Sequence, residues 1–418
     1  MSSEIFERVA RDVAAILPHR AGDLARLTLL AESGVPVVTV VGKYNHGKSS
    51  LLNELIGRQT FAVSDKRETV ALSDTVHLGV RWLDAPGLDA DVGTEDDRHA
   101  LHAVWMSSDI RLFVHAAKEG ELDAKEQALL AELRADEEKT KRRTFFILSQ
   151  VDQLADEDEL HHVSDAIRAQ FADVEPLAVS SMRHRKGQES GKALLLQKSG
   201  IPALQASLRA ALENVPQARA DEAAQLHDSI VAELQQVRAA QNARLDTLRE
   251  TQQQQRVAFD HGLTAVIAKV SGDIEAMLNA LGTDHAIVPD TAKDIYASTA
   301  GKRERGHIQI AYSRACIAID GYLAGHGVVE LPTAQQTAAS SLNSVMIAVM
   351  GVSVKFRKDL RKMFCEASGR ERMQRDFTHY YELSADRRAL AARIAELEST
   401  LAAADHASAS LVNLKAAR

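Results

Sequence analysis

Residues 42–50, GKYNHGKSS, restrict the possible folds of this chain more than any other segment. They follow the apolar run VPVVTVV and precede LLNELIG. This segment matches the pattern G-x-x-x-x-G-K-[ST] and stands between a predicted strand and a predicted helix. In that position the backbone N–H groups of a glycine turn and of a helix N-terminus converge on phosphate. The segment therefore predicts a nucleotide phosphate loop in a domain whose parallel sheet is covered by helices.

The chemistry of this phosphate loop assigns roles to its residues. Lys48 is expected to reach the β- and γ-phosphates, and the Ser49 hydroxyl is expected to bind Mg²⁺. The full set of predicted nucleotide contacts in the loop is Gly42, Asn45, His46, Gly47, Lys48, Ser49 and Ser50.

Residues 35–215 alternate between short apolar runs and helical patterns. The predicted strands are 35–41, 74–79, 80–85, 109–117, 144–150 and 175–181, and a helix at 201–215 is expected to end at Pro216. Strands that alternate with helices indicate an α/β domain, with a mostly parallel sheet and helices on both faces. We name this domain the head.

Polar motifs follow these strands in the order that nucleotide hydrolysis needs. Asp84, in DAPG, ends an apolar strand and is placed to bind the Mg²⁺ shell, and the Gly87 N–H is expected to face the γ-phosphate. The polar segment 64–75 lies before DAPG and suits a switch loop. Its Thr69 is the predicted Mg²⁺-binding hydroxyl, and Thr75 is the next candidate.

The segment SQVD follows the strand TFFIL, at the position of the guanine-reading motif N-K-x-D. Its Asp152 fits the role of accepting two hydrogen bonds from guanine N1–H and the exocyclic amine, a pattern that adenine does not offer. Ser149 and Gln150 replace the usual Asn and Lys, which weakens the guanine signal. Ser180 and Ser181 follow the last strand and resemble the loop whose backbone N–H meets guanine O6.

Taken together, GKYNHGKSSLLNELIG, Thr69, DAPG and the SQVD position resemble the dynamin-like large GTPases. The likeness is greatest to bacterial members, whose phosphate loop often has the form G-x-F-N-A-G-K-S-S/T-L-L-N. The segment RETVALSDTVHLGVRWLDAPGL also resembles Era-like GTPases, so the head alone leaves both branches open. The resemblance implies GTP hydrolysis to GDP with Mg²⁺ by in-line attack of water, with Lys48, Thr69 and Gly87 acting on the γ-phosphate.

The water-positioning residues of related GTPases are missing from this chain. Leu88 follows DAPG, where small signalling GTPases have Gln, and Tyr44 and Asn45 stand where eukaryotic dynamins have Gln and Ser. Hydrolysis is therefore expected to be slow without dimerisation or a partner. Lys43 or Asn45 could act across a head-to-head dimer.

Residues 216–418 carry helical patterns and no strand-rich segment. Apolar residues recur at steps of three and four, with one polar member in each row, in two sets: Leu226, Ile230, Leu234, Val237, Gln241, Leu245 and Leu248; and Leu383, Arg387, Leu390, Ile394, Leu397 and Leu401. This periodicity predicts two long helices that pair in antiparallel fashion within an elongated all-α bundle. The amphipathic residues 1–34 are expected to pack with that bundle.

Apolar density peaks within residues 340–364, where VMIAVM precedes a run of basic residues that ends at Lys362. One interpretation is a tip that enters an anionic membrane surface near Val345–Lys362. The other is a buried segment of the bundle followed by a solvated basic face. The apolar run is too short to span a bilayer.

Composition and charge exclude some classes of function. The net charge of −8 argues against a nucleic-acid partner. Cys316 and Cys365 lack metal-ligand spacing, and the N-terminus lacks the basic region of a secretory signal, so a cytoplasmic location is expected. Peripheral association with the inner face of the membrane is compatible with both observations.

Two hypotheses of different classes follow. In the first, a dynamin-like GTPase couples nucleotide state through its helical stalk to membrane association or self-assembly, as a homodimer or with a partner protein. In the second, a soluble nucleotide-switched protein docks a partner chain through its helices. A third hypothesis, an Era-like GTPase that acts on ribosomal RNA, is opposed by the acidic charge and by the lack of an RNA-binding module.

Overall fold

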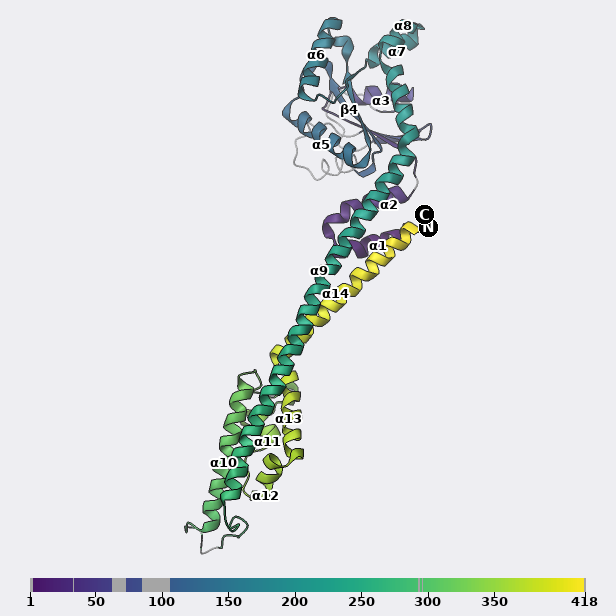
Figure 1. Cartoon of the computed structure of the whole chain (residues 1–418). Coiled ribbons are helices and arrows are strands. Elements are labelled where there is room, and N and C mark those ends of the chain that lie inside the picture. The colour runs from purple at the N-terminus through teal and green to yellow at the C-terminus, as the bar shows by residue number, and fades with distance from the viewer. Residues whose placement is uncertain are drawn as a thin grey trace. The chain divides into compact units, whose positions relative to one another are not determined.

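The computed structural model describes residues 3–32, 34–61, 73–84, 106–291, 294 and 296–416 (Figure 1). The chain divides into two compact units, Met1–Gln235 with His406–Arg418, and Gln236–Asp405. The predicted head boundary at 215/216 falls inside helix α9, Ile201–Ala280, so the prediction that Pro216 ends the helix is wrong. Burial of Val215 and Ala223 on either side of the proline stabilises the helix against a cost of about 3 kcal/mol.

The described residues of the first unit contain one six-stranded sheet in the order β2-β3-β1-β4-β5-β6. Its strands are β1 Val37–Val41, β2 Ser73–His77, β3 Val80–Asp84, β4 Ile110–Ala116, β5 Arg143–Ser149 and β6 Leu177–Ala178. Neighbouring strands are parallel except β2 and β3, which form a hairpin through the left-handed residues Leu78 and Gly79. The predicted mostly parallel sheet is confirmed.

Helices cover both faces of this sheet because alternate strand residues point in opposite directions. Leu112 and Val114 of β4 pack with α3, Lys48–Ile56, and with the start of α9. Phe113 packs on the other face with α5, Ala124–Thr140, and α6, Glu157–Gln170. The remaining helices of the first unit are α1 Ser3–Ile16, η1 Pro18–Arg20, α2 Ala21–Ala31, η2 Ala117–Glu119, η3 Val151–Gln153, α7 Ser181–Ser190 and α8 Ala193–Lys198.

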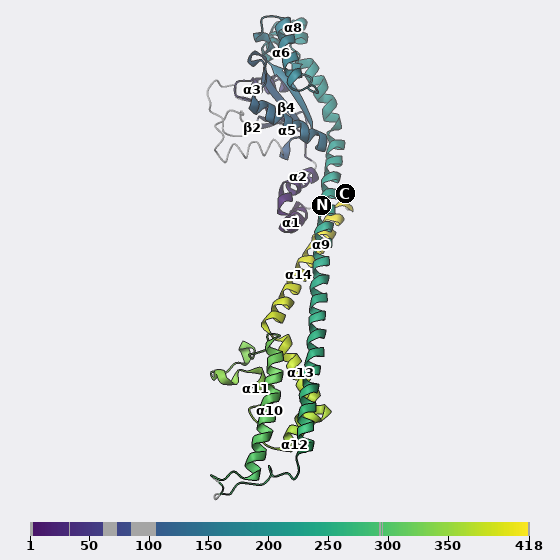
Figure 2. The same cartoon turned by 60° about the vertical axis from the view of Figure 1, so that its left-hand side comes forward.

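In the second unit α9 shares one apolar core with α10, Ala300–Ala324, and α13, Ala367–Glu382, and these three helices lie side by side (Figure 2). Phe259 of α9 stacks on Tyr381 of α13 with ring centroids 3.9 Å apart. The further helices of this unit are η5 Thr333–Gln335, η6 Ser340–Leu342, α11 Val345–Met350, α12 Arg357–Leu360, the π-helical turn η7 Arg361–Cys365 and α14 Ala385–Ala416, whose residues from His406 onward belong to the first unit.

Helices α9 and α14 pair along the predicted apolar seam. Leu245 packs with Ile394 and Leu401, and the ion pairs Arg238–Asp405 and Arg249–Glu398 run in antiparallel order. The polar position Arg387 is buried and donates to the Gln252 carbonyl and to Gln255 Oε1. The predicted pairing is confirmed, and the guanidinium fills the gap in the seam while donating hydrogen bonds to α9.

The apolar run VMIAVM forms α11 inside the core of the second unit. Val345, Met346, Val349 and Met350 are buried, and the Tyr312 hydroxyl donates to the Met350 carbonyl at 2.8 Å. The alternative prediction, that this run is a buried segment of the bundle, is therefore confirmed, and contact with an anionic membrane near Val345–Lys362 stays a prediction. Within the described ranges, no helix is long and apolar enough to cross a membrane.

Candidate nucleotide-binding site

The phosphate loop connects β1 to α3 and needs glycine at two positions. Gly42 has φ +150°, and a Cβ there would lie 2.2 Å from the Val114 carbonyl oxygen. Gly47, with φ +83°, precedes the first residue of α3. Lys48, Ser49 and Ser50 therefore form the first turn of a helix whose N-terminus favours an anion.

The loop meets the end of β3 because β1 and β3 are parallel neighbours, with Val40 opposite Asp84. Ser49 Oγ donates to Asp84 Oδ2 at 2.6 Å, and Lys48 Nζ donates to the Lys43 carbonyl at 2.8 Å. Burial raises the pKa of Asp84, an effect that the Ser49 bond and the Lys48 charge oppose.

The hydroxyl of Ser49 and the carboxylate of Asp84 are oxygen donors of the kind that Mg²⁺ takes. The second carboxylate oxygen of Asp84 is buried and makes no hydrogen bond among the described residues. A buried, unpartnered carboxylate oxygen beside a hydroxyl fits a cation ligand. Thr69 and Gly87, the other predicted γ-phosphate residues, lie outside the described residues, and Thr75 lies within β2 rather than in a loop.

The predicted guanine side of the site lies after β5 and β6. Ser180 Oγ donates to Asp152 Oδ1 at 2.5 Å and also accepts the Arg183 N–H as the N-cap of α7. Ser181 begins that helix. The structure thus brings Asp152 and Ser180 together, and the short bond fixes the orientation of the carboxylate that is predicted to face the base.

Ser149 and Gln150 hold the phosphate loop, a role that the sequence pattern did not indicate. Ser149 Oγ donates to the His46 carbonyl at 2.6 Å, and Gln150 Nε2 donates to the Asn45 carbonyl at 2.6 Å. Gln150 adopts a left-handed backbone with φ 58°, which lets its side chain reach the loop. Ser149 and Gln150, the two residues that differ from N-K-x-D, therefore hold the loop backbone from the end of β5.

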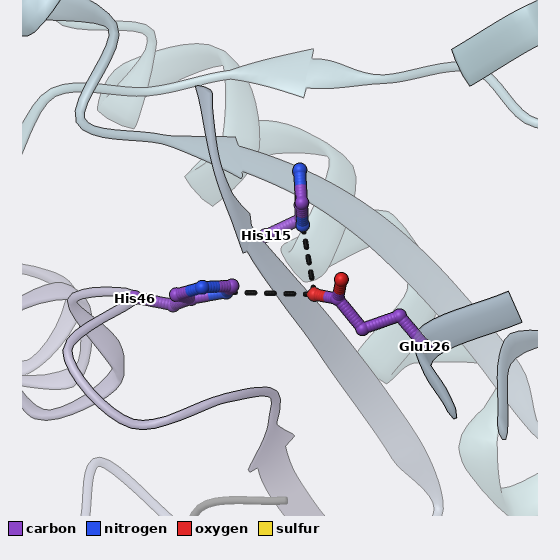
Figure 3. A group of neighbouring side chains, drawn as sticks. All are labelled: His46, His115 and Glu126. Atoms are coloured by element: carbon purple, nitrogen blue, oxygen red, sulfur yellow. Dashed lines mark hydrogen bonds and ion pairs between the residues drawn. The ribbon is translucent and has the colours of Figure 1, made fainter. Parts of the chain in front are cut away.

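His46 lies in a buried cluster with His115 of β4 and Glu126 of α5 (Figure 3). Glu126 Oε1 is 2.8 Å from His115 Nδ1 and 3.6 Å from His46 Nδ1. The side chain predicted to contact nucleotide is thus turned toward Glu126. Burial opposes the charge of Glu126, but the bonds from His115, Asp123 N–H and Lys43 hold its pKa below the usual range.

Acidification is expected to weaken the fold through His46. Burial lowers the pKa of His46, and this effect, with smaller ones from His115 and Lys48, outweighs the Glu126 charge and the Val114 carbonyl, which act to raise it. Its contribution to stability is present above about pH 6.5, the unfolded value, and is lost as pH falls through the lower folded value. Between pH 7 and 5, His46→Ala should show a smaller loss of unfolding free energy than wild type in denaturant titrations. His161→Ala, at an exposed position, should keep the wild-type dependence of the unfolding free energy on pH.

Residues 37–150 match the family model described as 50S ribosome-binding GTPase, and the head is a P-loop GTPase domain. The chain is 47% identical over 395 residues, 94% of both sequences, to the uncharacterized protein ACIAD1443 of Acinetobacter baylyi. It belongs to the same family as that protein.

Other similar proteins match a smaller part of this chain in sequence, or match its structure with a low TM-score. GTPase Era of Bordetella pertussis is 28% identical over 171 residues, which are 40% of this chain and 55% of Era. A structure titled as an oligomerised bacterial dynamin pair that senses and tethers membranes aligns over 98% of this chain and 79% of its own, at 14% identity and a TM-score of 0.38. A TM-score this low establishes no shared architecture.

Proposed function

We propose that this chain binds GTP with Mg²⁺ and hydrolyses it to GDP and phosphate. We further propose that its helices couple nucleotide state to membrane association or self-assembly in a dynamin-like manner. The observation that carries the proposal is the Ser49–Asp84 bond of 2.6 Å beside Lys48, at the end of two parallel strands.

The residues act by positioning and by neutralising charge, which is most of what phosphoryl transfer requires. Lys48 exchanges its bond to the Lys43 carbonyl for the β- and γ-phosphates. Ser49 and Asp84 would hold Mg²⁺, which would supply positive charge to the phosphate oxygens when bound. Thr69 and Gly87 are proposed to contact the γ-phosphate side of the site.

Base selection is proposed to depend on Asp152. Its carboxylate accepts from guanine N1–H and the exocyclic amine, while the Ser180 bond holds it in place. Without an Asn and Lys at the preceding positions, this carboxylate is the main source of preference for GTP over ATP.

A buried charge network supports transmission from the head to α9. Asp109 Oδ2 accepts the Val37 N–H at the start of β1, the strand that leads into the phosphate loop. The same carboxylate binds Arg219 of α9 at 2.6 Å and Arg26 of α2 at 3.5 Å. A shift of β1 on nucleotide exchange is therefore passed directly to two helices.

The membrane part of the proposal now rests on side chains other than VMIAVM. Ile287 and Tyr296 are 63% and 100% exposed in the segment between α9 and α10, and Val352 is 74% exposed after α11. Arg357 donates to the Gly282 and Thr283 carbonyls and so joins these two segments. Exposed apolar side chains close in sequence to the exposed Lys355 and Lys358 suit peripheral contact with an anionic inner membrane face.

The second candidate is a soluble nucleotide-switched protein that docks a partner chain through its helices. The burial of α11 favours it, because the most apolar run of this region is not available to lipid. The two candidates share the GTPase site and differ only in what the second unit binds.

The test is turnover of GTP and ATP by the purified full chain with Mg²⁺, over a range of protein concentrations, with and without anionic phospholipid vesicles. We expect a preference for GTP that Asp152→Asn removes, turnover that rises with protein concentration, and vesicle binding that depends on nucleotide. Neither binding nor turnover of GTP would refute the GTPase proposal. Normal turnover without vesicle binding in any nucleotide state would leave the partner-docking candidate.

A further inference from the structure

Glu126 is a fully buried carboxylate that the proposed reaction does not use. It is 0% exposed, three residues after the α5 N-cap Asp123, and its Oε2 accepts the Asp123 N–H at 3.2 Å. The capping box at the start of α5 explains the position of one carboxylate oxygen, Oε2. Its other contacts, with side chains of the phosphate loop and with His115 of β4, require a separate explanation.

Two loop side chains converge on this carboxylate. Lys43 Nζ lies 3.2 Å from Glu126 Oε2 and 2.6 Å from Asp123 Oδ2, and His46 Nδ1 lies 3.6 Å from Glu126 Oε1. The carbonyl of Lys43 in turn accepts the Lys48 ammonium at 2.8 Å. Glu126 is therefore linked through one residue to the lysine that is placed to bind the phosphates.

His115 holds the opposite side of Glu126. Its Nδ1 is 2.8 Å from Glu126 Oε1, and its Nε2 is 3.1 Å from the Gly120 carbonyl. Both ring nitrogens therefore face oxygen atoms, and the ring holds Glu126 from the strand beside the loop.

Two imidazoles and a carboxylate with ligand atoms within 4.8 Å also match the donors of a zinc site. The groups already have other partners, however. Lys43 occupies the second carboxylate oxygen, and the Ala116 N–H donates to His46 Nδ1 at 3.3 Å. Additional positive charge beside Lys43 and Lys48 would be disfavoured, so the hydrogen-bonded arrangement is the one this cluster supports.

We infer that Glu126 is a positioning residue for GTP turnover, which fixes Lys43 so that the phosphate loop keeps the shape in which Lys48 meets the phosphates. The inference rests on the proposed GTPase function and deepens it. Ser149 and Gln150 hold the loop backbone from β5, and Glu126 holds the Lys43 side chain from α5. The variable middle of the loop is thus anchored from two directions.

The test compares Glu126→Gln with Glu137→Gln in the full chain. The first substitution keeps the capping acceptor and the side-chain volume but removes the negative charge. Glu137 lies on the same helix, pairs with Arg134 at 3.2 Å and accepts the Thr144 N–H, away from the loop. We expect Glu126→Gln to raise KM for GTP and Kd for a fluorescent GDP analogue about tenfold, with kcat changed less than about twofold, whereas Glu137→Gln keeps wild-type values.

Lys43→Met gives a second measure of the same contact. If Glu126 acts through Lys43, Lys43→Met should also raise KM for GTP. The rise in KM in the double variant should then be smaller than the product of the rises in the two single variants. Melting temperatures measured in parallel separate altered nucleotide binding from partial unfolding. Wild-type KM in Glu126→Gln, or an equal rise in Glu137→Gln, would overturn the inference.

A metal outcome would also overturn it. Stoichiometric zinc in the wild-type chain that is lost in His115→Ala, with turnover abolished by a zinc chelator, would replace the hydrogen-bonded arrangement with a metal site. Failure of the proposed function is recognised separately, because it shows in the wild-type chain as the absence of both GTP turnover and GDP-analogue binding.

Discussion

Lys48→Ala is expected to lower kcat/KM for GTP by about 10²–10³-fold, the loss that follows removal of one preorganised donor to developing charge. The side chain of Lys48 is mostly buried in the loop, and its ammonium has only to move from the Lys43 carbonyl to the phosphates. The folded state should change little, because the lost bond of 2.8 Å is to a loop carbonyl that water can satisfy.

Single-turnover and steady-state assays with GTP, together with GDP-analogue binding, measure this effect. Lys118→Ala is the matched control, since Lys118 is an exposed lysine in η2 and should keep wild-type turnover. A rate in Lys48→Ala within about threefold of wild type would show that the loop does not neutralise phosphate charge as proposed. The same assay with Lys118→Ala shows whether loss of an exposed lysine elsewhere in the head has a comparable effect.

Features encoded by local pattern were predictable from the sequence. The strand that precedes the loop, the helix from Lys48, and the turn at Gly79 follow from short apolar runs and glycine positions. The proximity of Ser49 and Asp84 was implied because both were assigned to one Mg²⁺ ion, and the register of β1 and β3 places the two side chains together.

Features that depend on strand order were not predictable. His46 meets His115 and Glu126, which follow it by about 70 and 80 residues, only because β1 lies beside β4 and α5 follows β4. From the sequence, Ser149 was interpreted as weakening guanine recognition, because the sequence shows only that it stands at the Asn position of N-K-x-D. Its bond to the His46 carbonyl exists because β5 lies beside β4.

Two local rules failed because packing outweighed them. Pro216 ends isolated helices, but here buried neighbours such as Val215 keep α9 continuous. The run from Val345 to Met350 has the composition of a membrane-inserting segment, yet it packs into the core around Tyr312. Composition predicts that such a run is buried away from water. Only the tertiary structure shows that the core of the protein buries it.

Arg26→Ala is expected to lower the free energy of unfolding by about 3–5 kcal/mol, because it removes the closest cation from the buried carboxylate of Glu222. Arg26 is 4% exposed, and it donates to Glu222 at 2.8 and 3.1 Å and to the Met106 carbonyl at 2.7 Å. When Arg26 is removed, the nearest cation left to Glu222 among the described residues is Arg142, at 3.4 Å.

Arg20→Ala is the matched control in denaturant unfolding. Arg20 also contacts two carboxylates, Asp23 at 2.7 Å and Glu233 at 2.7 Å, but its side chain is partly exposed, so its removal should cost no more than about 1 kcal/mol. A similar small cost for Arg26→Ala would mean that water reaches Glu222 and that the network is not the rigid link proposed between β1, α2 and α9. If the large cost is found, Arg26→Leu combined with Glu222→Leu should recover part of it, because removing both charges also removes the desolvation penalty that the single variant leaves behind.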